Sequence, residues 1–196
     1  MSDADVAVVG YALYGQDNRG YFYSGSDVPA CETCGLVLDS DWMSPTFVPP
    51  RQQYDLSHTY DGVTIVGERM TDLIRTWPGV ALDPLPAAPH LSRLSSTQFV
   101  QFDLDRGTPT QTALCDTCQR YSQVATGNGR WLEPGCSVPD GLNRTDLDVG
   151  SAFDHPHNRM LQHPLLVVNR QYWFQLQEAG LGVHGDPVKM VGTAAE

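Results

Sequence analysis

The motif Cys31-Glu32-Thr33-Cys34 returns in closely matching form as Cys115-Asp116-Thr117-Cys118. In each CxxC motif the spacing lets a tight turn present two sulfurs to one metal ion. Two such motifs together supply the four ligands of a closed tetrahedral zinc site. We therefore predict a bound Zn²⁺ that fastens two distant parts of the chain to each other. Its predicted ligands are Cys31, Cys34, Cys115 and Cys118.

Two other roles for these cysteines stay open. A redox CxxC needs a thiol whose pKa is lowered by a helix N-terminus or a cation, whereas Glu32 and Asp116 oppose a thiolate here. Structural disulfides require an exported chain, and the sequence after Met1 has neither a basic start nor a long apolar segment. We therefore expect a cytoplasmic protein. For the fifth cysteine, Cys136, we expect a small, partly buried side chain and assign no role.

Length and charge limit the possible partners. A chain of 196 residues with 41% hydrophobic residues can bury a proper core, so we predict a single globular unit over residues 1–196. No apolar run approaches the roughly 20 residues of a membrane span, so no membrane contact is expected. The 12 basic residues stand against 23 acidic ones, which gives a net charge of −11. Such a chain repels nucleic acid and anionic lipid and favours a basic protein partner.

An internal repeat is the next feature of the sequence. Residues Gly79–Pro84 and Gly182–Pro187 share the pattern Gly-Val-x-x-Asp-Pro. The same shift of 103 positions places the apolar run Val63–Val66 over Leu166–Asn169. We therefore predict two related segments, residues 61–84 and 164–187.

Each predicted copy contains a short strand, a helix and an extended exit. Apolar residues at helical spacing predict helices over residues 68–77 and 171–179. Gly79 and Gly182 are expected just past these helices, in the left-handed conformation that favours glycine. With 18 glycines and 14 prolines, the rest should be rich in loops. The predicted fold class is α+β, with two related strand-helix-strand lobes joined by the four-cysteine zinc site.

The sequence carries no complete catalytic motif. Residues 10–15 lack the Gly-x-Gly-x-x-Gly spacing, and neither a phosphate-binding Gly-x-x-x-x-Gly-Lys-Ser/Thr nor a Gly-x-Ser-x-Gly elbow occurs. We therefore predict that the protein is not an enzyme. Closely spaced carboxylates are the candidate partner-binding groups instead. They are Asp39 with Asp41, and Asp146 with Asp148.

The order of these motifs resembles the double-CXXCG proteins of myxobacteria, a group that includes immunity proteins against contact-delivered toxins. Cys31–Gly35 carries the full CxxCG, a strand-helix unit follows, and Thr145–Asp148 lies before the closing strand and helix. Gln119 departs from the pattern, which has glycine after the second CxxC. The resemblance implies a zinc-binding protein that neutralises a basic toxin, such as a nuclease, by binding it. A zinc-ribbon-like interaction module in transcription or assembly is the alternative, and a CxxC redox enzyme is a third interpretation.

Overall fold

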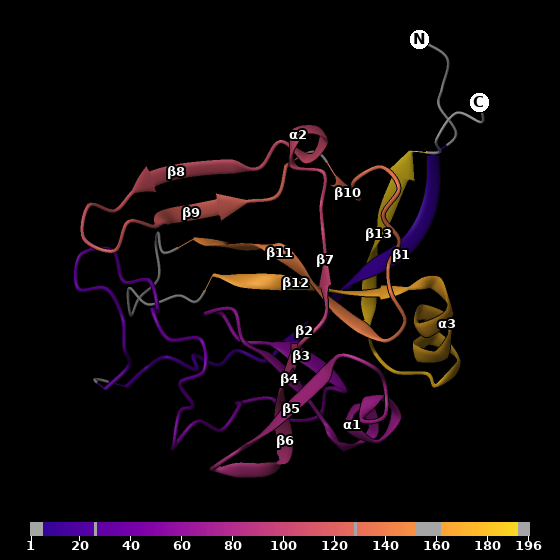
Figure 1. The fold of residues 1–196 in the computed structure, drawn as a ribbon. Helices are drawn as coiled ribbons and strands as arrows, with labels where there is room; N and C mark the ends of the chain where they lie inside the picture. The colour runs from indigo at the N-terminus through magenta and orange to yellow at the C-terminus, as the bar shows by residue number, and fades with distance from the viewer. Residues whose placement is uncertain (1–5, 26, 128, 152–161, 192–196) are drawn as a thin grey trace.

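The computed structural model describes residues 6–25, 27–127, 129–151 and 162–191. Strands make up 43% of the structure and helices 12%, arranged as two sheets (Figure 1). The predicted α+β class is therefore wrong, and the fold is mostly β. Within the described ranges, no helix is long and apolar enough to cross a membrane. The helices are α1 (Glu68–Ile74), α2 (Leu104–Gly107) and α3 (Arg170–Glu178).

The larger sheet curls into a half-barrel. Its strands are β1 (Val6–Tyr14), β7 (Phe99–Val100), β8 (Thr110–Leu114), β9 (Tyr121–Ala125), β10 (Arg130–Trp131), β11 (Leu142–Ser151), β12 (His163–Asn169) and β13 (His184–Val191). They follow the order β10-β13-β1-β12-β11-β9-β8, and β7 pairs with β11. The hairpin of β8 and β9 lies at the far end of this order, and Figure 1 shows it at the upper left.

The smaller sheet has the order β2-β3-β4-β6-β5. Its strands are β2 (Gln16–Asp17), β3 (Leu56–His58), β4 (Thr64–Val66), β5 (Val80–Leu85) and β6 (Ala88–Ser96). The β5–β6 hairpin forms in a segment that contains Pro84, Pro86 and Pro89. Pro84 is accommodated because β5 is an edge strand, where a missing ladder donor is tolerated.

The two segments of the predicted repeat have the same kind of connection inside these sheets. Helix α1 links β4 to β5, and both of these strands pair antiparallel with β6 between them. Helix α3 links β12 to β13, and both pair antiparallel with β1 between them. The units are thus built into larger sheets and do not form the separate lobes predicted from the sequence. A common origin of the two segments stays a prediction.

One hydrophobic cluster packs between parts of the two sheets and against the helices α1 and α3. Burying each of its large side chains contributes roughly 1.5–3 kcal/mol relative to exposure. Packing of this kind, and not helical propensity, keeps helices of seven and nine residues formed. The cluster consists of Leu13, Leu56, Val66, Met70, Ile74, Trp77, Leu94, Leu142, Leu166, Val168, Leu176, Leu181 and Val183.

A second cluster anchors the long loop between β2 and β3 to the smaller sheet. Phe22 packs edge-on against Tyr23 and Phe47, with both pairs of ring centroids 5.1 Å apart. These rings contact buried residues of the sheet, including Ile65 and Leu91. The loop therefore has a core of its own, and it carries the first CxxC motif.

The glycines after α1 and α3 generate the first testable prediction. Gly79 has a φ of +76°, and a Cβ added there would lie 2.2 Å from the carbonyl oxygen of Leu142. Gly180 has a φ of +64° with open space around it. The left-handed conformation expected after each helix is confirmed at Gly79. It is wrong at Gly182, because the left-handed position after α3 falls on Gly180.

We expect Gly79→Ala to lower the free energy of unfolding by about 3 kcal/mol or more, since it combines backbone strain with a clash. Gly180→Ala should cost only about 1 kcal/mol, from the left-handed conformation alone. Gly182→Ala is the matched control and should be close to neutral, because nothing lies within 4 Å. Urea unfolding measures all three, and equal losses at positions 79 and 180 would contradict the explanation.

Candidate metal centre

The first CxxC motif forms a tight turn in the loop between β2 and β3. The backbone N–H of Cys31 donates to the carbonyl of Leu36 over 2.8 Å, and the N–H of Gly35 donates to the carbonyl of Cys31 over 2.8 Å. Gly35 has a φ of +76°, which closes the turn without a side-chain penalty. Both cysteine side chains are thereby placed on the same side of the turn.

The second CxxC motif forms the same turn at the tip of the β8–β9 hairpin. Cys115 N–H donates to the carbonyl of Arg120 over 2.9 Å, and Gln119 N–H donates to the carbonyl of Cys115 over 2.9 Å. These are the bonds of the first turn moved by 84 positions. Gln119 also adopts a positive φ, +57°, so the chain keeps the left-handed geometry although glycine is missing.

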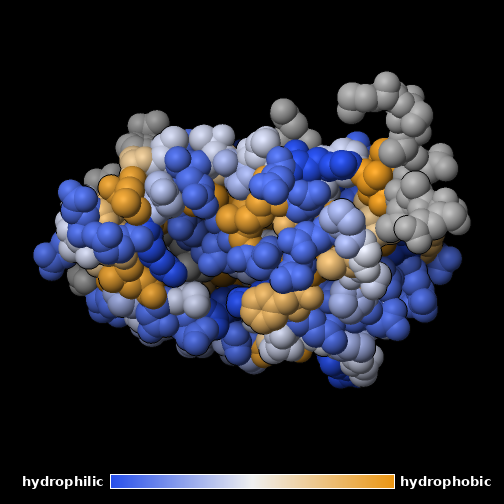
Figure 2. Space-filling view, turned by 45° about the horizontal axis from the view of Figure 1, so that its top comes forward, coloured by the Kyte–Doolittle hydropathy of each residue, from blue (hydrophilic) through white to orange (hydrophobic). Residues whose placement is uncertain are grey.

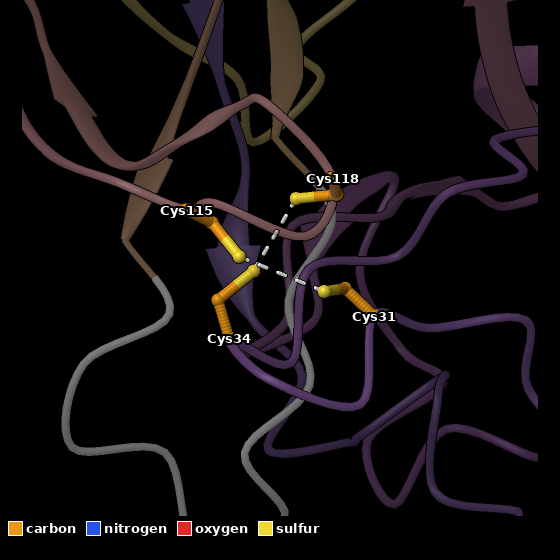
Figure 3. Close-up of side chains that lie close together, drawn as sticks. All are labelled: Cys31, Cys34, Cys115 and Cys118. Carbon is orange, nitrogen blue, oxygen red and sulfur yellow. Dashed lines mark hydrogen bonds between the residues drawn. The ribbon is translucent and has the colours of Figure 1, made fainter.

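The two turns meet face to face through equivalent residues. The hydroxyl oxygens of Thr33 and Thr117 lie 2.8 Å apart and share a hydrogen bond. Sequence reasoning missed this contact, although the threonine repeated at the third position of both motifs was a signal for it. Figure 3 shows the four cysteine sulfurs pointing toward one another from the two turns.

The sulfur positions fit one tetrahedral metal ion. The Cys31 and Cys115 sulfurs are 3.8 Å apart, and those of Cys34 and Cys118 are 3.6 Å apart. All four lie within 4.8 Å of one another. A tetrahedron with metal–sulfur bonds of about 2.3 Å has sulfur–sulfur edges of about 3.8 Å, whereas a disulfide needs about 2.05 Å. The four predicted ligands thus come together as free thiols that could hold a metal ion.

Each turn holds one cysteine whose pKa is lowered and one whose pKa is raised. Backbone hydrogen bonds from Cys118 and Thr117 lower the pKa of the Cys115 thiol to about 6. Backbone hydrogen bonds from Cys34 and Thr33 lower the pKa of Cys31 in the same way. Desolvation instead raises the pKa of Cys34 to about 12 and also raises that of Cys118. Backbone hydrogen bonds therefore favour the thiolate form of one cysteine in each turn, and a cation between the sulfurs would favour ionisation of the other two.

The four-cysteine cluster joins a weakly packed hairpin to an anchored loop. All five residues of β8 are exposed, and only Ser122 and Val124 of β9 are buried. Besides the cysteines, Arg120 links the turns by donating a hydrogen bond from Nη1 to the Val37 carbonyl over 3.4 Å. A hairpin with so little apolar burial is marginal without another attachment. The four-cysteine cluster supplies an attachment in addition to the pairing of β9 with β11.

The candidate partner-binding carboxylates are placed differently from one another. Asp39 and Asp41 are both exposed, and the Asp39 side chain accepts a hydrogen bond from the Asp41 N–H over 2.9 Å. Asp146 on β11 is exposed and accepts a long hydrogen bond, 3.4 Å, from the Phe102 N–H. Partial desolvation raises the pKa of Asp148, opposed by the charge of Arg144. Asp39 and Asp41 are thus the freer pair, and a role in binding stays a prediction for all four.

Comparison with known proteins gives no relative for this chain. No family model matches the sequence, no curated protein matches it, and no solved structure matches the fold. The likeness to the double-CXXCG proteins therefore rests on the motifs and their order.

The pair Gly35 and Gln119 yields a prediction about the two turns. Because both residues have a positive φ, Gln119→Gly removes left-handed strain worth roughly 1–2 kcal/mol and adds chain entropy worth roughly 0.5–1 kcal/mol. The net result should be a small gain in stability, reduced by loss of the Gln119 hydrogen bond to the Asp116 carbonyl. Gly35→Gln is the mirror variant and should be destabilising. Thermal unfolding of both measures this, and a loss on Gln119→Gly larger than that on Gly35→Gln would contradict the equivalence of the turns.

Proposed function

We propose that the four cysteines bind one Zn²⁺ and that the protein is a zinc-stapled immunity or inhibitor protein, which neutralises a basic toxin by binding it. The observation that supports zinc binding is the convergence of four sulfurs at tetrahedral distances. Four thiolates are a soft donor set that selects zinc or iron–sulfur chemistry. A complete set of four cysteine ligands leaves zinc no open coordination position for substrate, which is typical of a structural site.

The charge of the chain supports a basic partner. A net charge of −11 speeds association with a positively charged protein through electrostatic steering. Toxins that attack nucleic acid are usually basic, and the motif order resembles that of immunity proteins. These two supports are independent, since one concerns composition and the other the position of motifs.

The end of the molecule around the metal centre has the mixed chemistry of a docking surface. Glu32 and Asp116 are exposed between the cysteines of each turn. Large apolar side chains are also exposed beside the turns, and Figure 2 shows hydrophobic patches among hydrophilic atoms at this left end of the molecule. Protein interfaces combine an apolar centre with a polar rim in this way. The exposed apolar residues are Leu38, Leu114 and Tyr121.

The alternative is a zinc-ribbon-like interaction module with a partner in transcription or assembly. It would use the same staple and the same surface, so it differs from the immunity proposal only in the partner. The neighbouring gene separates the two, because immunity proteins are encoded beside their toxins.

We expect the purified protein to contain one zinc per chain by elemental analysis. Chelation, or Cys31→Ser, should lower the free energy of unfolding by several kcal/mol, because metal binding energy becomes folding energy. Hydrogen exchange should rise first in β8 and β9, since these strands have little other packing.

The control for this experiment is Cys136→Ser, which removes a thiol that lies outside the metal centre. It should keep the zinc and the slow exchange of the hairpin. Iron in place of zinc, or both CxxC motifs oxidised with no metal, would overturn the zinc assignment.

Charge reversal should test the docking surface. With the neighbouring gene's product as partner, Asp39→Lys with Asp41→Lys should slow association by about tenfold and reduce its dependence on salt. The same is expected for Glu32→Lys with Asp116→Lys. Stopped-flow mixing at several salt concentrations measures both rates.

The control variant changes the net charge equally at a different place. Asp72→Lys with Glu178→Lys alters exposed positions on α1 and α3 and should slow association less. If the neighbouring product is toxic and co-expression of this protein does not restore growth, the immunity proposal fails. An association rate that does not change with salt concentration would contradict the electrostatic argument.

A further inference from the structure

A cavity of about 360 Å³ lies between the two sheets, away from the cysteines. Strands β4 and β6 of the smaller sheet line one side, and β7, β11 and β12 of the larger sheet line the other. Its volume falls in the range of about 300–1,000 Å³ that small-molecule sites occupy. The two sheets therefore form a cleft large enough for a ligand.

Two arginines, Arg93 and Arg144, line this cleft. Arg93 has both an ion pair and hydrogen bonds within the protein. Arg93 pairs with the Asp83 carboxylate over 2.9 Å and donates to the Ser40 carbonyl over 2.6 Å. Arg93 therefore has a structural role, as it ties the long loop to β5 and β6.

Arg144 has no comparable partner within the described residues. Its guanidinium carbon lies 4.2 Å from the centroid of the Phe99 ring, and its buried Nε has no hydrogen-bond partner there. Among the same residues it forms no ion pair at 4 Å or less. No carboxylate of the described residues therefore pairs with this guanidinium, which leaves its charge available to an anionic ligand in the cleft.

The other charges around the cleft limit the ligand to a single negative charge. Asp41 lines the same cavity, and Asp148 lies within the electrostatic range of Arg144. Burial lowers the pKa of His163 in the lining, and burial together with His163 lowers the pKa of the stacked His58 to about 4. Both imidazoles are therefore neutral at pH 7 and add no positive charge. A doubly charged phosphate finds too little compensation here.

The shape of the Arg144 guanidinium and the apolar lining of the cleft indicate the kind of ligand that fits. A guanidinium presents parallel N–H groups that match the two oxygens of a carboxylate. The Phe99 ring stacks on this guanidinium, and Val63, Leu94 and Leu166 supply apolar lining. We propose that the cleft binds a small monocarboxylate with a flat apolar body, and that Arg144 pairs with its carboxylate.

The test uses the full chain and 1-naphthoate as the probe. Titration followed by amide chemical shifts should show saturable binding to one site, with shifts at residues 95–97 and 163–166. The neutral analogue 1-naphthalenemethanol and inorganic phosphate should each bind about tenfold more weakly or worse. Arg144→Gln should weaken 1-naphthoate binding by about tenfold or more, because the ion pair is lost.

Arg75→Gln is the matched control, since it removes an exposed arginine that follows α1, and it should leave 1-naphthoate binding unchanged. Comparison of the three probes on the unaltered chain tests the proposed carboxylate site even if Arg144→Gln fails to fold. Equal affinity for the alcohol and the carboxylate would overturn the proposal. So would full affinity in folded Arg144→Gln, or no saturable binding of 1-naphthoate up to about 10 mM, a range in which even weak sites are detected.

Discussion

The contact between the two CxxC turns is the constraint on which one end of the molecule depends. The β8–β9 hairpin forms one edge of the larger sheet, where β9 pairs with β11, yet β8 buries none of its side chains. Hydrophobic packing therefore contributes little to holding this hairpin in place. A metal ion bound by the four cysteines would compensate, because a metal–thiolate centre needs only four side chains where a core needs a whole face.

The four-cysteine cluster can hold the hairpin because the loop of the first CxxC turn is itself packed against the smaller sheet. Phe22, Tyr23 and Phe47 fix the loop of the first turn to the smaller sheet, and the cluster between the sheets fixes that sheet to β1 and β12. A tie to a mobile loop would only restrict two flexible segments relative to each other. Here the contact between the two CxxC turns connects the hairpin to a loop that is packed against the core. The hydrogen bond of Thr33 with Thr117 fixes the orientation of the two turns.

Sequence reasoning found the candidate site more reliably than the fold, for a physical reason. A CxxC turn is local, since the two backbone hydrogen bonds that close it join residues four and five positions apart, and four thiolates form a complete ligand set. Local periodicity also predicted helices at residues 68–77 and 171–179, and the structure has them at Glu68–Ile74, three residues shorter, and Arg170–Glu178. The sheets depend on pairings such as β1 with β13, across most of the chain, which local patterns do not contain. The cleft was invisible in the sequence for the same reason, since Arg93, Arg144 and His163 come from three strands and meet only in the folded protein.

Ion pairs use half of the arginines in the described part of the chain, and Arg144 is not among them. Each of the five ion pairs in the described part of the chain joins an arginine to an aspartate. Within the described residues, Glu32, Asp39 and Asp116 belong to none of these pairs, and all three are exposed at the surface. Four thiolates around a divalent ion would add two further negative charges between Glu32 and Asp116. On the proposed assignment, the metal would therefore both hold the hairpin and strengthen the negative potential of the surface beside it.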